Sequence, residues 1–216
     1  SAVEMPWINK AKGLVHAYLS GQAGAEAILR VITGKVNPSG KLAETYPLKY
    51  EDTSSFKYFP GKEVSVEYRE GIFIGYRYYD TANVDVLFPF GYGLSYTTFE
   101  YSDIKVDDNG VSFKIKNTGN IDGMEVAQLY VGCKSDEIFR AKKELKGFVK
   151  VFIKAGELKD LRINFDDKTF RYWNIKTGQW EIETGTYQIM VGASVADIRL
   201  TGMTERKGNS KGYPYN

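Results

Sequence analysis

The sequence predicts an α+β protein, with an α/β segment in its first third and an antiparallel β-sandwich in the remainder. Two patterns support this prediction. A helical pattern flanked by extended segments is typical of an α/β unit. From about Thr98 onward, apolar and polar residues alternate between regularly spaced turns, as in the strands of a sandwich. The 216 residues can form two small cores, so we expect two packed units.

The helical pattern covers residues 23–33. Its apolar residues are spaced to share one face of a helix, and Gly34 follows where a C-terminal cap is expected. These apolar residues are Ala27, Ile28, Val31 and Ile32. A short apolar run at residues 14–19 precedes the helix, and the turn-forming residues 37–40 follow it. The order strand, helix, extended segment therefore indicates an α/β unit.

Strand signals dominate the second part of the chain. Residues 111–116, 161–166 and 187–191 each alternate between apolar and polar side chains, which is the period of a half-buried strand. The segments between them contain Gly and Asn, which adopt turn conformations at little cost. Residues 68–99 are dense in aromatic residues and glycine, and we expect them to pack the two units together. The predicted divisions are 1–94, 95–205 and a tail or linker at 206–216.

Composition excludes several kinds of partner and cofactor. Lys and Arg number 29 against 27 Asp and Glu, with the signs interspersed, so we expect no nucleic-acid partner. No apolar run approaches the roughly 20 residues that span a bilayer, so we expect no membrane segment. The one cysteine, Cys133, cannot form an internal disulfide, which favours a cytoplasmic location. The one histidine, His16, lies in an apolar context and is interpreted as structural, so no metal or other cofactor is expected.

Several short motifs occur in a definite order along the chain. They are Pro6-Trp7, Gly21-Gln22-Ala23-Gly24, Gly34-Lys35-Val36-Asn37-Pro38-Ser39-Gly40-Lys41-Leu42, residues 68–80 and residues 88–99. This order resembles the glycoside hydrolase family 3 β-glucosidases. Three later blocks, residues 116–119, 126–131 and 143–148, resemble the fibronectin type III-like domain of that family. The resemblance covers nearly the whole chain. One departure is Ala23, where many relatives have Glu, so no role of that carboxylate is carried over.

The resemblance implies the last part of an α/β sandwich domain followed by a fibronectin type III-like β-sandwich. A retaining glycosidase needs two carboxyl groups about 5 Å apart. In this family they lie on a barrel domain and on a loop of the α/β domain upstream of the Pro-Trp block, so we expect no catalytic residue in this chain. The expected partners are the barrel and upstream α/β domain of a parent enzyme, whose substrate would be a β-glucoside or related oligosaccharide. We expect the chain alone to be inactive.

Within the chain, the candidates for a structural junction are Glu70, Arg77, Tyr76 and Tyr79. Glu70 is the carboxylate whose setting best fits a tuned pKa, because aromatic residues and a cation lie close in sequence. A partly buried Glu that pairs with a nearby polar group is more often structural, and we interpret Glu70 and Arg77 in this way. A carbohydrate-binding or protein-interaction β-sandwich module is the alternative, since the 16 tyrosines and three tryptophans could stack on sugar rings.

Overall fold

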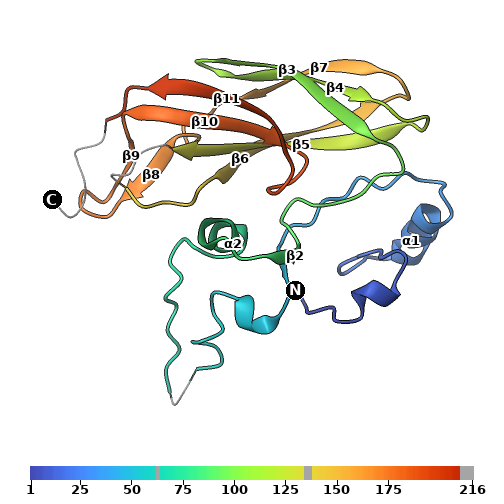
Figure 1. The fold of residues 1–216 in the computed structure, drawn as a ribbon, viewed down its shortest axis with the longest axis horizontal. Helices are drawn as coiled ribbons and strands as arrows, with labels where there is room; N and C mark the ends of the chain where they lie inside the picture. Colours follow the sequence, from blue (N-terminus) through green and yellow to red (C-terminus); the bar gives the residue numbers. More distant parts are fainter. Residues whose placement is uncertain (62–63, 134–137, 210–216) are drawn as a thin grey trace.

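The structure is a computed structural model that describes residues 1–61, 64–133 and 138–209. A β-sandwich forms one half of the molecule, and residues 1–94 run beneath it as a chain with two short α-helices (Figure 1). The fold is thus α+β with antiparallel sheets, as the sequence predicts. None of the helices in the described ranges is long and apolar enough to cross a membrane.

The sandwich consists of two antiparallel sheets. One has the strand order β11-β10-β5-β6 and the other β3-β4-β7. The strands are β3 (Phe99–Asp107), β4 (Gly110–Asn117), β5 (Gly123–Cys133), β6 (Glu144–Ile153), β7 (Leu158–Asn164), β10 (Gly185–Gly192) and β11 (Ile198–Arg206). The inner faces of the two sheets enclose one core. β11 includes Arg206, the first residue of the predicted tail, and residues 210–216 of that tail lie outside the described residues.

The period-two segments of the sequence are confirmed as strands β4, β7 and β10. Their apolar positions point inward because successive side chains of a strand face opposite sides. Val111, Phe113 and Ile115 of β4 are buried in one apolar cluster with Ile189 of β10. At roughly 25 cal/mol per Å² of apolar surface removed from water, such a cluster dominates the stability of a domain of this size.

A short hairpin projects at the end of the sandwich that lies farthest from helix α1 (Figure 1). It is formed by β8 (Arg171–Asn174) and β9 (Gln179–Ile182), which pair with each other and with no other strand in the described part of the chain. A two-stranded hairpin is marginal in water by itself, and this one gains further hydrogen bonds between Ile182 and Asn209.

Residues 1–94 contain α1 (Gly24–Ile32), α2 (Tyr76–Ala82), the strand pair β1 (Tyr46–Pro47) and β2 (Val86–Phe88), and two short 3-10 helices at Ile8–Lys10 and Tyr50–Asp52. The predicted helix is confirmed as α1, and Gly34 follows it with a φ of 71°, which glycine adopts without strain. The apolar run at residues 14–19, expected as a strand, forms none in the described part of the chain, and Tyr18 within it has a positive φ of 50°. The described residues therefore contain no strand that pairs with this run.

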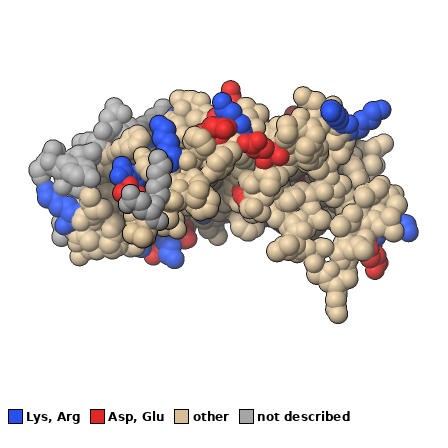
Figure 2. All heavy atoms as spheres, turned by 90° about the horizontal axis from the view of Figure 1, so that it is seen from below, with Lys and Arg blue, Asp and Glu red and all other residues tan. Residues whose placement is uncertain are grey.

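Apolar side chains of residues 1–94 remain largely uncovered. The exposed ones include Leu14, Val15, Leu19, Leu29, Ile32, Phe59, Tyr68, Ile72 and Ile74. Figure 2 views the molecule from the side on which residues 1–94 lie, and most of that surface is formed by residues other than Lys, Arg, Asp and Glu. Exposed apolar surface of this extent marks an interaction face in a soluble protein.

Candidate functional site at the junction of the two units

Helix α2 carries three of the four predicted junction residues. Gly75 precedes the helix with φ 55° and ψ −138°, a conformation open to glycine, and Asn83 ends it in the left-handed region. Between them Tyr76 and Tyr79 are buried, while Arg77 is half-buried. The motif around residues 75–80 therefore folds as a single short helix with two aromatic anchors.

Three side chains of α2 pair with three consecutive residues, namely the residue before β6 and the first two residues of that strand. The Leu145 amide donates to the Tyr76 hydroxyl at 2.9 Å, Arg77 Nε donates to Glu144 Oε1 at 3.0 Å, and Lys143 Nζ donates to Asp80 Oδ1 at 2.7 Å. The pairing of β5 with β6 shifts register at this point, so that Leu129 faces Gly147 and Tyr130 faces Leu145. The blocks at 75–80 and 143–148, which lie far apart in sequence, therefore recognise each other; we call this set of contacts the α2–β6 seam.

The structure places Glu70 apart from this seam. Its side chain is half-buried, and its backbone carbonyl accepts a hydrogen bond from the Phe73 amide at 2.9 Å. The ion-pair partner of Arg77 is Glu144, a residue for which the sequence offered no specific signal. Tyr76 and Arg77 thus both contact β6, while the roles of Tyr79 and Glu70 at the junction stay predictions.

Burial sets the electrostatics of the buried tyrosines in α2 and of Tyr130, which packs against Tyr76. Desolvation raises the pKa of Tyr76, Tyr79 and Tyr130 above the ordinary tyrosine value. The ring of Tyr76 stacks on Phe90 with centroids 4.8 Å apart and meets Tyr130 edge-on at 6.2 Å. These hydroxyls stay protonated at neutral pH, so they act as hydrogen-bonding and packing groups rather than as acids or bases.

A second contact joins the block at residues 88–99 to strand β5. Gln128 is buried, and its Nε2 donates to the carbonyl of Gly91 at 3.0 Å and to that of Ala193 at 2.7 Å. Its Oε1 accepts the hydroxyl of Tyr130 at 2.6 Å, so both ends of the amide are bonded. A Cβ at Gly91 would lie 2.1 Å from Gln128 Oε1, so this approach requires glycine.

A third contact is made by the turn at residues 37–41. Asn37 Nδ2 donates to the carbonyl of Asp122 at 3.0 Å, and its Oδ1 accepts from Ser95 Oγ at 2.9 Å. At the other end of the turn, Lys41 lies beside Glu125 of β5, which also accepts the hydroxyl of Tyr101 at 2.8 Å. A signal for Glu125 was present in the sequence, because the period of β5 places residue 125 on the same inward face as residues 127 and 129.

The arrangement supports structural rather than catalytic chemistry. The carboxylates of the three contacts, Asp80, Glu125 and Glu144, each have a cationic partner. Among the described residues, no three His, Cys, Asp or Glu side chains come together as a metal site requires. His16 is held by Tyr46, whose hydroxyl lies 2.9 Å from His16 Nε2. What the site can do is fix the position of residues 1–94 on the sandwich.

The fold and this junction define an α/β segment docked on a fibronectin type III-like sandwich. A family model described as the glycosyl hydrolase family 3 C-terminal domain matches residues 1–96, and one described as a fibronectin type III-like domain matches residues 125–195. The chain belongs to glycoside hydrolase family 3 and corresponds to the C-terminal region of its β-glucosidases.

Relatives and solved structures agree with this assignment. Thermostable β-glucosidase B of Acetivibrio thermocellus is 50% identical over 208 residues, which are 93% of this chain and 28% of that protein. An exo-α-(1→6)-L-arabinopyranosidase of Bifidobacterium longum is 44% identical over 97% of this chain and 28% of its own length. The crystal structure of a Bifidobacterium adolescentis GH3 β-glucosidase superposes with a TM-score of 0.90 at 43% identity, over 95% of this chain and 31% of that chain. The chain thus spans less than a third of the length of these relatives.

Proposed function

We propose that this chain is the C-terminal part of a retaining β-glucosidase-like glycoside hydrolase and that it completes and braces the catalytic domains. The observation that carries the proposal is the uncovered apolar surface of residues 1–94, in particular the helix face of α1 and the unpaired segment 14–19. A preceding stretch of an α/β domain would supply a strand to that segment and cover that face. A β-glucoside or related oligosaccharide is the proposed substrate of the whole enzyme.

The contacts at the junction indicate separate roles for the sandwich and for residues 1–94. The three contacts with the sandwich hold α2 and the turn at residues 37–41 by hydrogen bonds and ion pairs, while much of the remaining surface of residues 1–94 is left apolar. The sandwich therefore acts as a base on which this segment is presented to the rest of the enzyme. Cytoplasmic location remains a proposal that rests on the single cysteine.

The test is a hydrolysis assay with an aryl β-glucoside, using the purified 216-residue chain beside the full-length enzyme. We expect no turnover by the chain above background, because protonation of the leaving oxygen and attack at the anomeric carbon need two carboxyl groups that we place elsewhere. A chain carrying Glu70→Gln serves as the contamination control. Activity of the chain that disappears in this variant would overturn the proposal.

A further inference from the structure

The β8–β9 hairpin displays two tryptophans on its solvent side. Trp173 and Trp180 are a directly opposite pair across the two strands, with ring centroids 5.4 Å apart and planes at 73°. Their side chains are 49% and 58% exposed, although indoles are usually well buried. Of the three tryptophans in the chain, two therefore stand side by side in water at the end of the sandwich.

The opposite side of the hairpin is built to hold these rings still. Glu181 is only 2% exposed, and its carboxylate accepts hydrogen bonds from Asn174 Nδ2 at 2.9 Å, Thr177 Oγ1 at 2.7 Å and the Tyr172 hydroxyl at 3.3 Å. A buried carboxylate is costly unless such donors surround it. The network fixes the turn and both strands, so Trp173 and Trp180 are presented on a rigid support.

The size and charge of the patch favour a small neutral ligand. Two half-exposed indoles offer roughly 200 Å² of surface, whereas a stable protein interface buries about 800 Å² on each partner. Arg171 lies on the same side of the hairpin, and Asp167 neutralises it at a distance of 3.0 Å. A second copy of the chain or an ionic ligand therefore fits this surface poorly.

We propose that Trp173 and Trp180 form a carbohydrate-binding site that stacks one or two pyranose rings of a neutral oligosaccharide. The axial C–H groups of a pyranose form an apolar face whose hydrogens carry a partial positive charge. This face complements the electron-rich face of an indole. In β-linked glucose every hydroxyl is equatorial, so both faces of each ring consist of C–H groups. The two indole planes meet at an angle that lets one ring support a sugar face while the other contacts its edge.

The hairpin also lies at the end of the sandwich away from α1, whose apolar face we assign to the parent enzyme (Figure 1). A glycan bound there would not compete with that surface. Sugar binding by the hairpin is a different property from the bracing role proposed above. The two are tested separately, because binding is measured without hydrolysis.

The experiment is a fluorescence titration of the 216-residue chain with cellotetraose in a Trp7→Phe background, so that the signal comes from Trp173 and Trp180 alone. We expect a saturable change at millimolar ligand. Mannitol, an open-chain polyol with hydroxyls but no ring face, should give none. Absence of saturation with cellotetraose, or equal responses to both compounds, would overturn the proposal.

Variants locate the site. Trp173→Ala and Trp180→Ala, each measured by calorimetry and each checked for an unchanged fold by circular dichroism, should weaken binding at least about tenfold, or about 1.4 kcal/mol. Leu158→Ala, at an exposed apolar position on β7, is the matched control and should bind like the parent chain. Equal binding by all three variants rules the hairpin out. In the full-length enzyme, acrylamide should quench both tryptophans, and protection of both would show instead that the rest of the enzyme covers them.

Discussion

Lys41 and Glu125 form an ion pair that is shielded from water at the junction of the two units. Nζ of Lys41 lies 3.5 Å from Oε1 of Glu125, and the two side chains are 14% and 5% exposed. Lys41 also donates to the carbonyl of Gly93 at 3.2 Å, so its charge is held from two directions. The pair joins the turn at residues 37–41 to the middle of the sandwich.

Removal of one partner should therefore cost more than the pair itself contributes. Lys41→Met leaves the Glu125 carboxylate buried without its cation, and we expect the free energy of unfolding to fall by about 3 kcal/mol. Adding Glu125→Gln should recover part of this loss, because the orphaned charge is gone. Urea unfolding followed by circular dichroism measures both effects.

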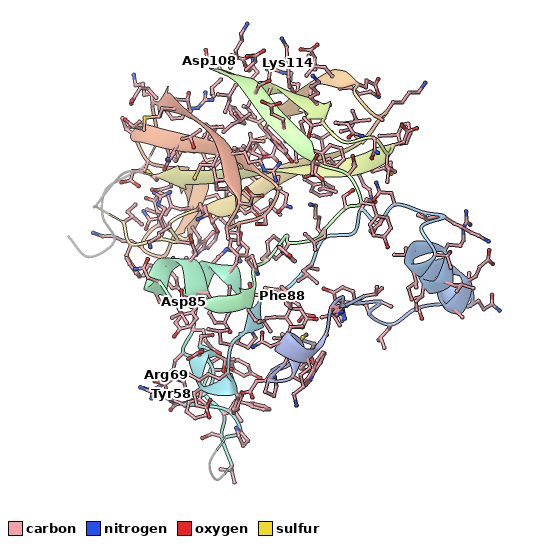
Figure 3. The ribbon with its side chains drawn as sticks, turned by 45° about the vertical axis from the view of Figure 1, so that its right-hand side comes forward. Tyr58, Arg69, Asp85, Phe88, Asp108 and Lys114 are labelled. Carbon is pink, nitrogen blue, oxygen red and sulfur yellow. The ribbon has the colours of Figure 1, made fainter. Side chains whose placement is uncertain are left out.

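The control for this prediction is Lys114→Met. Lys114 of β4 (Figure 3) pairs with Asp103 at 2.8 Å on the outer face of the β3-β4-β7 sheet, and both side chains are more than a third exposed. An exposed pair of this kind contributes less than about 1 kcal/mol. Equal losses in Lys41→Met and Lys114→Met would contradict a special role for the buried pair.

The Tyr76 hydroxyl is the acceptor for a backbone amide of β6. In Tyr76→Phe the Leu145 amide loses this partner, and we expect a loss of about 1–2 kcal/mol in unfolding free energy. Hydrogen exchange of the Leu145 amide should accelerate in the variant, which a general loss of packing would not produce at one site. Tyr78→Phe on the same helix is the matched control, and similar exchange in the two variants would argue against the α2–β6 seam.

Glu70→Gln in the full-length enzyme tests the structural interpretation of this carboxylate. We expect kcat to stay within about threefold, since an acid/base residue would contribute roughly 100-fold or more. A small fall in melting temperature is expected from the half-buried position. Glu67→Gln, at an exposed carboxylate that pairs with Arg69 near Tyr58 (Figure 3), is the control. A kcat that collapses while the melting temperature holds would show that Glu70 takes part in the chemistry.

Buried tyrosines should make the sandwich unfold at alkaline pH. Burial raises the pKa of Tyr187 to about 12, and its hydroxyl donates to the carbonyl of Glu183 at 2.9 Å. Up to pH of about 10, folded and unfolded chains both keep this proton. Above that, the unfolded chain releases it while the folded chain retains it until about pH 12, so stability falls with rising pH.

Denaturant unfolding at several pH values measures this effect. The fall in unfolding free energy above pH of about 10 should be shallower in Tyr187→Phe, which has no phenol to titrate at this position. Tyr68→Phe is the control, because Tyr68 is 88% exposed and lies outside the sandwich. A slope unchanged by Tyr187→Phe but reduced by Tyr68→Phe would contradict the prediction.

The sequence predicted the strands of the sandwich well because their inward and outward positions differ sharply in polarity. Phe113 is an example, because it is buried while its neighbours Ser112 and Lys114 are polar and only half-buried. The helix α1 was predicted for the same reason. Both patterns are local, so they can be recognised without knowing which element packs against the segment.

The contacts of the junction could not be predicted in this way. Arg77 pairs with Glu144 across 67 positions of sequence, and no periodicity in either segment carries that information. Glu70 lies closer to Arg77 in sequence and is also a carboxylate, so the sequence drew attention to Glu70 and not to Glu144. Tyr76 was expected at the junction because of its aromatic context, but its acceptor role depends on the register shift opposite Tyr130, which only the folded sheets create.

Helix α2 has a further consequence for how the chain can be divided. β6 is an outer strand of its sheet, and α2 occupies the start of its free side. An open strand edge is a template for pairing with other molecules, and proteins cover such edges to avoid aggregation. A shortened chain of residues 95–205 would keep the cluster between the two sheets but lose Tyr76 of the second buried cluster, and with it this cover. We expect such a sandwich to self-associate increasingly as its concentration rises, because the segment before residue 95 no longer covers this edge.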